Sequence, residues 1–367
     1  MAAPRTTTWK LDPHTRAKHE ILGHYLKAWT PILSLGGFPT IAYVDGFAGP
    51  GVYSNGEDGS PIIALKVALE HQSKIKANVL FLFIEKEDDR ARKLEQLVSA
   101  LGLPANFRTK VVGGRTFEQG FREHLIHFYK KQGKGLPPTF AFIDPFGWTG
   151  VPFALVREIL GNPSCEVLIN FMFEEINRFI GHPDQEENFN ALFGTDEWRK
   201  MEKTSEKKAR REFLHGLYLQ QLRAGAGAKY VRSFEMRNDK DVTDYFLFFA
   251  TNSPKGMSKM KEAMWKVDQS GEFRFSDATN PDQALLFTPK PDFDQLRRAI
   301  CARFSGTTAT VAEVEDFVLA DTPYRETHYK KQVLLPLERE GKITPVNQRK
   351  GRKAGTYADP TMGIRFT

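Results

Sequence analysis

The sequence predicts an α/β protein with an open, mostly parallel sheet, followed by a small C-terminal domain of winged-helix type. Three observations lead to this prediction. Buried apolar runs alternate with helical patterns over residues 14–267, as in parallel sheets covered by helices. The first run ends in Asp45 and leads at once into a glycine-rich loop. Beyond residue 290 the pattern changes to three helices and a basic hairpin.

The first half of the chain is expected to alternate between helices and strands. Residues 14–35 carry apolar positions at helical spacing. Continuous apolar runs indicate strands covered on both faces, at 40–44, 79–84, 139–143 and 166–171, with a short strand at 110–112. Helices are predicted between them, at 62–69, 88–101, 117–131 and 152–160.

The second half is expected to complete the sheet and add a domain. Residues 173–222 read as a charged helical insertion, and strands at 229–236 and 244–251 bring the sheet to seven. A helix from Met257 to Val267 carries Met257, Met260, Met264 and Trp265 on one side, a stripe more typical of core packing than of a cofactor contact.

A Pro- and Asp-rich stretch at 279–292 marks the expected boundary between a domain at 1–285 and a winged helix at 290–367. The second domain is predicted to contain helices at 293–304, 310–319 and 324–339, a strand starting at 341, a basic loop at 347–355, and a last strand ending at Arg365.

Composition excludes several classes of protein. Only Cys165 and Cys301 occur, which excludes a disulfide scaffold and Cys-rich zinc or iron–sulfur sites. His14, His19 and His24 are five residues apart, do not stack on one helix face, and predict no metal site. No apolar run nears the roughly 20 residues that span a bilayer, and the first ten residues lack a secretory core. We therefore expect a cytoplasmic protein.

The glycine loop predicts a nucleotide-like ligand. A strand, a glycine loop and a helix in succession present backbone N–H groups to such ligands. The glycines fall at 46, 49 and 51, not in the G-x-G-x-x-G spacing of dinucleotide binders, and 14 residues separate Asp45 from Ser60. This longer loop favours S-adenosylmethionine (SAM), with Asp45 meeting its ammonium group directly or through water. The candidate contacts are Asp45, Gly46, Phe47, Ala48, Gly49 and Gly51. Ser60 and Pro61 are expected to cap the following helix.

Two further residues extend this prediction. Glu85 ends the second strand, where a carboxylate can accept both ribose hydroxyls, although acidic residues here also suit the N-terminus of the next helix. Phe117 follows the third strand beside Arg115, where an adenine ring would lie, and a core role for Phe117 fits equally well.

The segment Asp144-Pro-Phe-Gly147 is the part of the sequence that most specifically predicts catalytic residues. Methyl transfer to an exocyclic amine needs a polar acceptor for the N–H group and a flat surface for the base. Asp144 and the Pro145 carbonyl can accept hydrogen bonds, and Phe146 can stack. Such an acceptor works by positioning and by stabilising developing charge. A plain strand-end turn is the alternative. Asn170 ends the next strand and is expected to line the same crevice.

Four segments together resemble the three-Cys-motif partner (TcmP) family, over most of the chain. They are residues 45–51, Gly59-Ser-Pro61, Asp144-Pro-Phe-Gly147 and 256–268. The resemblance implies a class I methyltransferase-like domain and a radical-SAM-type partner protein that carries the three cysteines. The loop at 144–147 is also similar to the catalytic loop of tRNA guanine-N2 methyltransferases, and to the Asp-Pro-Pro-Tyr/Phe loop of adenine-N6 enzymes with Phe146 in place of the second Pro.

These observations favour a SAM-dependent methyltransferase acting on a base amine of RNA or DNA. The chain has a net charge of +7, and basic residues cluster near its end. Candidate phosphate contacts are Arg349, Lys350, Arg352, Lys353, Lys330 and Lys331, with Tyr324, Arg325, His328 and Tyr329 also on the third helix. Two alternatives stay open. One is a non-catalytic module that presents nucleic acid or a protein to a partner enzyme. The other is a nuclease that uses Asp45, Glu85 and Asp144.

Overall fold

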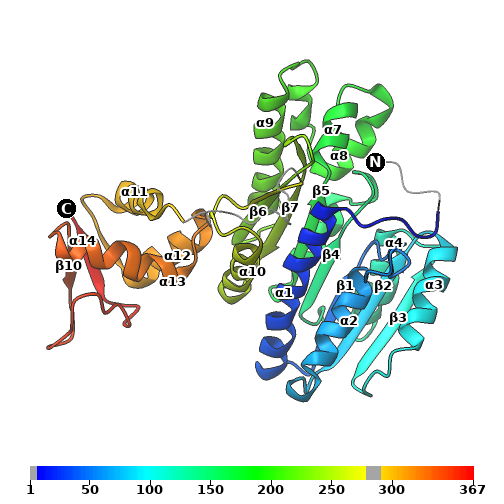
Figure 1. The fold of residues 1–367 in the computed structure, drawn as a ribbon, viewed down its shortest axis with the longest axis horizontal. Coiled ribbons are helices and arrows are strands. Elements are labelled where there is room, and N and C mark those ends of the chain that lie inside the picture. Colours follow the sequence, from blue (N-terminus) through cyan, green and yellow to red (C-terminus); the bar gives the residue numbers. More distant parts are fainter. Residues whose placement is uncertain (1–5, 278–290) are drawn as a thin grey trace.

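The computed structural model describes residues 6–277 and 291–367. It contains a mixed eight-stranded sheet between two layers of helices, and a smaller C-terminal domain beside one edge of that sheet (Figure 1). The predicted boundary stretch at 279–292 lies almost entirely outside the described residues. None of the helices in the described ranges is long and apolar enough to cross a membrane.

The large sheet has the strand order β3-β2-β1-β4-β5-β7-β6-β8. Strands β1 to β5 run parallel, and β7 is antiparallel to both of its neighbours. The bounds are β1 (Thr40–Asp45), β2 (Asn78–Glu85), β3 (Phe107–Gly113), β4 (Thr139–Ile143), β5 (Glu166–Phe171), β6 (Tyr230–Arg237), β7 (Thr243–Thr251) and β8 (Arg274–Ser276). The order reverses between β1 and β4, which opens a crevice at their carboxyl ends.

The prediction of seven strands was one too few. The eighth strand, β8, pairs in parallel with β6 over three residues, Arg274–Ser276. A segment this short and half exposed carries no apolar alternation that a sequence pattern could detect. The other seven strands were confirmed, and β3 is longer than expected because its outer residues are polar on an exposed sheet edge.

Helices cover both faces of the sheet. One face carries α1 (Pro13–Leu35), α2 (Ser60–Glu70), α3 (Asp88–Ser99) and α10 (Pro254–Val267); the other carries α4 (Phe117–Phe121), α5 (His127–Lys131) and α6 (Phe153–Leu160). A π-type turn at Arg122–Ile126 joins α4 to α5. The insertion forms α7 (Phe173–Phe179), α8 (Glu186–Phe193) and α9 (Lys207–Gln220), which extends through Gln221–Gly225; short 3-10 turns lie at Gln72–Lys74, Pro183–Gln185 and Glu197–Met201.

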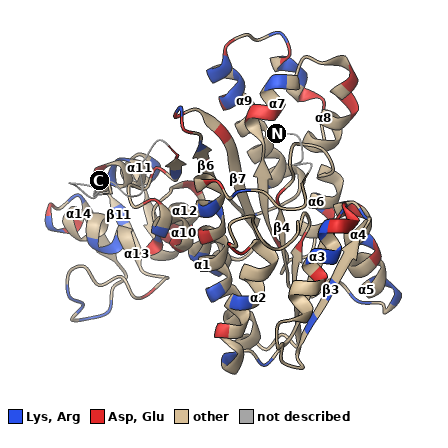
Figure 2. Cartoon of the chain, turned by 45° about the vertical axis from the view of Figure 1, so that its right-hand side comes forward, with Lys and Arg blue, Asp and Glu red and all other residues tan. Residues whose placement is uncertain are grey.

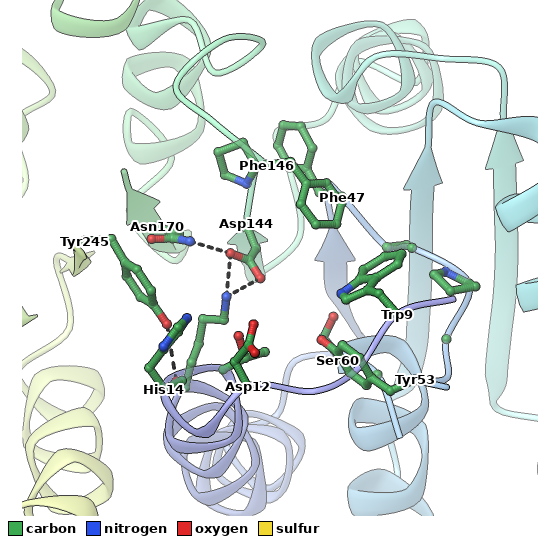
Figure 3. Close-up of a pocket in the computed structure, with 18 of the residues that line it drawn as sticks. Trp9, Asp12, His14, Phe47, Tyr53, Ser60, Asp144, Phe146, Asn170 and Tyr245 are labelled. Atoms are coloured by element: carbon green, nitrogen blue, oxygen red, sulfur yellow. Dashed lines mark hydrogen bonds and ion pairs between the residues drawn. The ribbon is translucent and has the colours of Figure 1, made fainter. Parts of the chain in front are cut away.

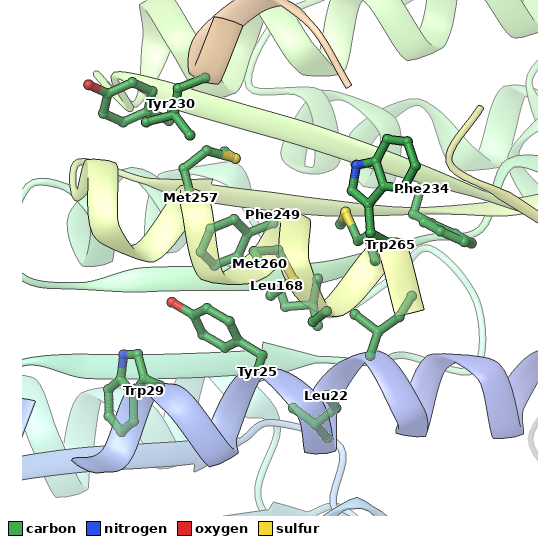
Figure 4. Packing of buried hydrophobic residues seen from close by; sticks show 14 of the residues in the cluster. Leu22, Tyr25, Trp29, Leu168, Tyr230, Phe234, Phe249, Met257, Met260 and Trp265 are labelled. Atoms are coloured by element: carbon green, nitrogen blue, oxygen red, sulfur yellow. The ribbon is translucent and has the colours of Figure 1, made fainter. Parts of the chain in front are cut away.

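The central strands of the large sheet contribute alternate residues to two apolar cores. Tyr43 faces the layer of α1 and α10, whereas Val44 faces the layer of α4 to α9. Burial on both faces explains why these strands read as continuous apolar runs. The Met and Trp stripe of α10 was confirmed as core: Met257 and Met260 are fully buried, Met257 beside Tyr230 and Met260 near Phe249 and Leu168 (Figure 4).

The predicted cap of α2 was wrong in detail. The helix begins at Ser60, its N-cap is Gly59, and no side chain makes a capping hydrogen bond. Ser60 instead lines a cavity, and its hydroxyl hydrogen-bonds to Asp45.

The C-terminal domain has the predicted winged-helix order. Its elements are α11 (Phe293–Phe304), β9 (Thr308–Thr310), α12 (Val311–Asp321), α13 (Glu326–Tyr329), a π-type turn (Lys330–Leu334), α14 (Leu335–Arg339), β10 (Ile343–Val346) and β11 (Gly363–Phe366). The strands pair in the order β10-β11-β9, and Thr310 and Glu313 form a capping box at the start of α12. The loop between β10 and β11 forms the basic hairpin that the sequence predicts.

Three basic side chains of the large domain donate hydrogen bonds to backbone carbonyls at the carboxyl end of α12. The buried Lys261 Nζ donates to the carbonyls of Val318 (2.8 Å), Thr322 (2.6 Å) and Tyr324 (2.9 Å). Arg223 and Arg232 both donate to the carbonyl of Ala320, at 3.0 Å and 2.9 Å. Carbonyls at a helix end carry partial negative charge. These contacts therefore hold the winged helix against β6 and α10.

Candidate active site

The carboxyl ends of the parallel strands meet at two adjoining cavities. The first, here called the acceptor cavity, has a volume of about 120 Å³ and lies over Gly49, Ser60, Asp144 and Asn170 (Figure 3). The second, here called the side cavity, measures about 320 Å³ and is lined by Gly46, Glu85, Arg115 and Phe117. The two share three residues, Phe47, Pro145 and Phe146. The glycine loop and the Asp144-Pro-Phe segment thus form their common wall.

The loop after β1 adopts a shape that requires glycine. Gly49 and Gly51 have φ of 61° and 78°, the left-handed region that side chains disfavour. A Cβ on Gly51 would lie 2.6 Å from Leu94 Cδ1, and one on Gly46 would lie 2.5 Å from the Phe117 ring. The loop can therefore pack closely on α3 and Phe117 while Gly46 to Gly51 border the cavities.

Glu85 lies at the end of β2 and faces the side cavity. Its Oε2 accepts the Gly49 N–H at 2.8 Å and its Oε1 accepts the Glu87 N–H at 2.9 Å. Burial raises the pKa of Glu85, while the two N–H donors oppose that shift. A carboxylate oxygen has two lone pairs, so each oxygen can accept a further hydrogen bond from a ligand hydroxyl.

Asp45 is fully buried at the end of β1 and lines neither cavity. It accepts the Phe47 N–H at 3.3 Å. Burial raises its pKa to about 7, against the opposing effects of the Ser60 hydroxyl and the Phe47 N–H. The structure thus places Asp45 beneath the loop, and Ser60, rather than Asp45, faces the acceptor cavity.

Asp144 is held by two groups that donate to its carboxylate. Lys18 Nζ lies 2.7 Å from Oδ1 and 2.6 Å from Oδ2, and Asn170 Nδ2 donates to Oδ1 at 2.7 Å. The Asp144 side chain remains 19% exposed, whereas that of Lys18 is 6% exposed. The carboxylate is therefore fixed in place with one side open to the cavity. Asn170 lies where the sequence predicts.

Sequence reasoning missed Lys18, and one signal could have found it. Lys18 lies one turn before Leu22 and three residues before Ile21, on the apolar face of the first helix. A lysine on such a face needs a partner, because a buried ammonium is costly without one.

Aromatic side chains form the wall between the two cavities. Phe146 packs edge-on against Trp9, with ring centroids 5.0 Å apart, and Trp9 also contacts Tyr53 at 5.8 Å. Phe117 is 1% exposed and contacts Phe47 at 5.9 Å, so it belongs to the core as well as to the wall of the side cavity. Trp9 belongs to a polar N-terminal stretch without periodicity, which left no pattern to predict its place.

A further polar group lies on the other side of Asp144. His14 Nδ1 lies 2.6 Å from Asp277 Oδ2, and the Tyr245 hydroxyl donates to the His14 carbonyl at 3.3 Å. His14, Asp244 and Tyr245 line the acceptor cavity (Figure 3). Within 6–277 and 291–367, no cluster of three or more His, Cys, Asp or Glu side chains is arranged to hold a metal ion.

Some basic residues of the winged helix are exposed to solvent, and others form ion pairs within the domain. Arg349, Lys350 and Lys353 are exposed on the loop between β10 and β11, which projects from the domain at the lower left of Figure 2. Lys331 is also exposed, whereas Lys330 pairs with Glu315 at 3.0 Å.

Three expectations for this domain need correction. The Arg352 guanidinium pairs with Glu338 and is 8% exposed, so it supports the loop from inside. Tyr324 and Tyr329 are buried, and their hydroxyls bond to the Asp292 carbonyl and to Glu315. Their helical spacing could not distinguish an inward face from an outward one because the helix has polar residues on both sides.

Comparison with known proteins identifies the C-terminal domain. Residues 274–350 match the family model of the GMT-like wHTH domain. No curated protein matches the chain. Among solved structures, protein LPL1258 from Legionella pneumophila is 11% identical, with a TM-score of 0.39 over 68% of this chain and 92% of that one. Human methyltransferase-like protein 13 in complex with SAH is 10% identical, with a TM-score of 0.36 over 74% and 96%.

A putative O-methyltransferase from Klebsiella pneumoniae is similar at the same level, with 11% identity and a TM-score of 0.32 over 66% of this chain and 92% of that one. The chain joins an α/β domain with a mixed, mostly parallel sheet to a winged helix.

Proposed function

We propose that this chain is a SAM-dependent methyltransferase that modifies an exocyclic amine of a base in RNA or DNA. The observation that carries the proposal is the position of the Asp144-Pro-Phe segment in the common wall of two cavities. An acceptor held in one cavity would meet a cofactor held across the glycine loop at this wall. Membership of the three-Cys-motif partner family, with a radical-SAM-type partner protein, is part of the proposal.

The side cavity and the glycine loop have the groups that SAM needs. When bound, SAM supplies an electrophilic methyl group. Glu85 has a free lone pair on each oxygen for the ribose hydroxyls, and Phe117 and Phe47 offer apolar surface for the adenine ring. Gly49 and Gly51 let the backbone approach the amino-acid end. The Ser60 hydroxyl, which bonds to Asp45, can still accept a hydrogen bond there. These residues therefore fit the cofactor.

The acceptor cavity suits a planar base that carries an amine. Asp144 would accept one N–H of that amine and the Pro145 carbonyl the other, while Phe146 would support the ring. Lys18 and Asn170 hold the Asp144 carboxylate before the substrate arrives. Preorganised acceptors of this kind stabilise positive charge as it develops on the nitrogen.

The winged helix would bring the nucleic acid. Arg349, Lys350 and Lys353 are exposed together on one projecting loop, and such cations bind phosphates independently of sequence. Lys331 would add a contact from the third helix. Arg352 and Lys330 would support these contacts rather than make them.

The first test is calorimetric titration of the full chain with SAM. We expect micromolar binding by the wild type and at least ten-fold weaker binding by Glu85→Gln, since a hydrogen bond to a charged group is worth about 1.5–3 kcal/mol. Glu95→Gln is the matched control, because Glu95 is exposed on α3 and lines neither cavity. It should bind like the wild type.

Transfer of labelled methyl groups to total RNA and genomic DNA would then establish the substrate. Absence of SAM binding by the folded wild type would contradict the proposal. SAM binding without transfer to either nucleic acid would favour the non-catalytic alternative, in which the chain presents nucleic acid or a protein to a partner enzyme.

A further inference from the structure

The histidine on the far side of Asp144 has features that a purely structural residue does not need. His14 and Lys18 are four residues apart on α1, so they lie on one helix face. Both line the acceptor cavity together with Asp144. The His14 and Asp277 side chains are 10% and 11% exposed. A nearly buried imidazole–carboxylate pair thus opens into the cavity that would hold the substrate.

Hydrogen bonding determines which nitrogen of His14 can react. Asp277 Oδ2 lies 2.6 Å from Nδ1 and, as a carboxylate, only accepts, so Nδ1 carries the hydrogen and the neutral ring has its lone pair on Nε2. Nε2 lies 3.9 Å from Asp244 Oδ2, beyond a direct hydrogen bond. A proton taken up at Nε2 would be attracted by Asp244. Asp277 Oδ1 is buried and has no hydrogen-bond partner within the described ranges.

Asp144 is unsuited to keep a proton. Both of its oxygens face the Lys18 ammonium, and Oδ1 also accepts from Asn170. These three contacts occupy most of the lone pairs of the carboxylate and leave one on Oδ2 for an amine N–H. Asp144 can therefore position an amine and stabilise charge, but a proton released beside it has to leave to another group.

Methylation of an amine releases one proton. The nitrogen lone pair forms the new N–C bond, and the electron pair of the broken S–C bond stays on the sulfur of the departing thioether. The nitrogen is then cationic until it loses a proton. We propose that His14 Nε2 accepts this proton, directly or through one water, and that Asp277 stabilises the resulting imidazolium. This inference rests on the proposed function.

The surroundings of His14 contain charges of both signs. Asp277 follows β8, Asp244 and Tyr245 come from β7, Asp144 follows β4, and Asp12 and Lys18 flank His14 on its own helix. Catalysis needs the neutral ring before each turnover.

The kinetic test measures the rate of single-turnover methyl transfer by the full chain at saturating SAM. The substrate is total RNA or genomic DNA, depending on which of them accepts the labelled methyl group. The rate is measured between about pH 5.5 and 9. The wild-type rate should fall on the acid side as His14 becomes protonated. His14→Asn should lower the rate about 100-fold and abolish the acid limb. His24→Asn, a change on the same helix, is the matched control and should keep both rate and profile. An unchanged rate and profile in His14→Asn would overturn the inference.

A second readout does not depend on activity. Nitrogen-15 NMR of the imidazole in the unliganded chain should show a neutral ring with hydrogen on Nδ1 at alkaline pH, converting to the charged form on acidification. A ring that stays charged to pH 9, or carries its hydrogen on Nε2, would overturn the inference. If no nucleic acid accepts label, the proposed function fails at its substrate, and the NMR result still decides whether His14 can accept a proton.

Discussion

Removal of the Lys261 ammonium tests how the winged helix is held. The side chain is fully buried, and its Nζ donates to the carbonyls of Val318, Thr322 and Tyr324. Lys261→Met keeps the apolar stem and deletes the donors. The Val318 carbonyl keeps the Thr322 hydroxyl at 2.7 Å, so two carbonyls lose their side-chain donor.

The expected loss follows from those two carbonyls. A buried polar group left unsatisfied costs about 1–3 kcal/mol, which gives about 2–6 kcal/mol for the pair. Removing a buried charge recovers part of this cost. We therefore expect the free energy of unfolding to fall by about 2–4 kcal/mol.

The assay is urea denaturation of the full chain, followed by fluorescence and circular dichroism. Lys259→Met is the control on the same helix, because its partly exposed ion pair with Glu262 (2.7 Å) should contribute at most about 1 kcal/mol. Equal stability of the two variants would refute the view that Lys261 ties the domains together, since its three hydrogen bonds would then have no net effect.

Two further predictions concern the loop and the wing. Burial raises the pKa of Asp45 from 3.8 to about 7, so the native state binds more protons than the unfolded state between these values and loses stability as the pH rises through them. The free energy of unfolding of Asp45→Asn, relative to that of the wild type, should therefore rise between pH 4 and pH 8, by at most roughly 4 kcal/mol. Urea denaturation of both proteins at the two pH values measures this difference. A difference that does not change with pH would contradict the prediction. Replacing Arg349, Lys350 and Lys353 by Gln should reduce the slope of log Kd against log salt for duplex DNA by up to about 3, whereas a control with Lys74, Lys76 and Lys93 replaced should keep the wild-type slope. Equal slopes for the two triple variants, measured by fluorescence anisotropy, would exclude the wing as the phosphate contact.

The sequence by itself determined the elements and their general order. Runs such as Val79 to Ile84 are apolar at every position, which only a strand buried on both faces requires. The alternation of such strands with amphipathic helices implies right-handed crossovers and a parallel sheet. The carboxyl ends of the strands then meet at one edge, so the juxtaposition of Gly49, Glu85 and Asp144 followed from local pattern alone.

The tertiary structure alone decided how each of these side chains is used. Asp45 lies beneath the loop and Glu85 beside a cavity, although both end parallel strands. Lys18 meets Asp144 across 126 residues of chain, and His14 meets Asp277 across 263. Sequence periodicity reports which face of an element is apolar, within a few turns. It does not report which distant polar group satisfies a buried charge, because that pairing depends on how helices and strands pack after the chain has folded.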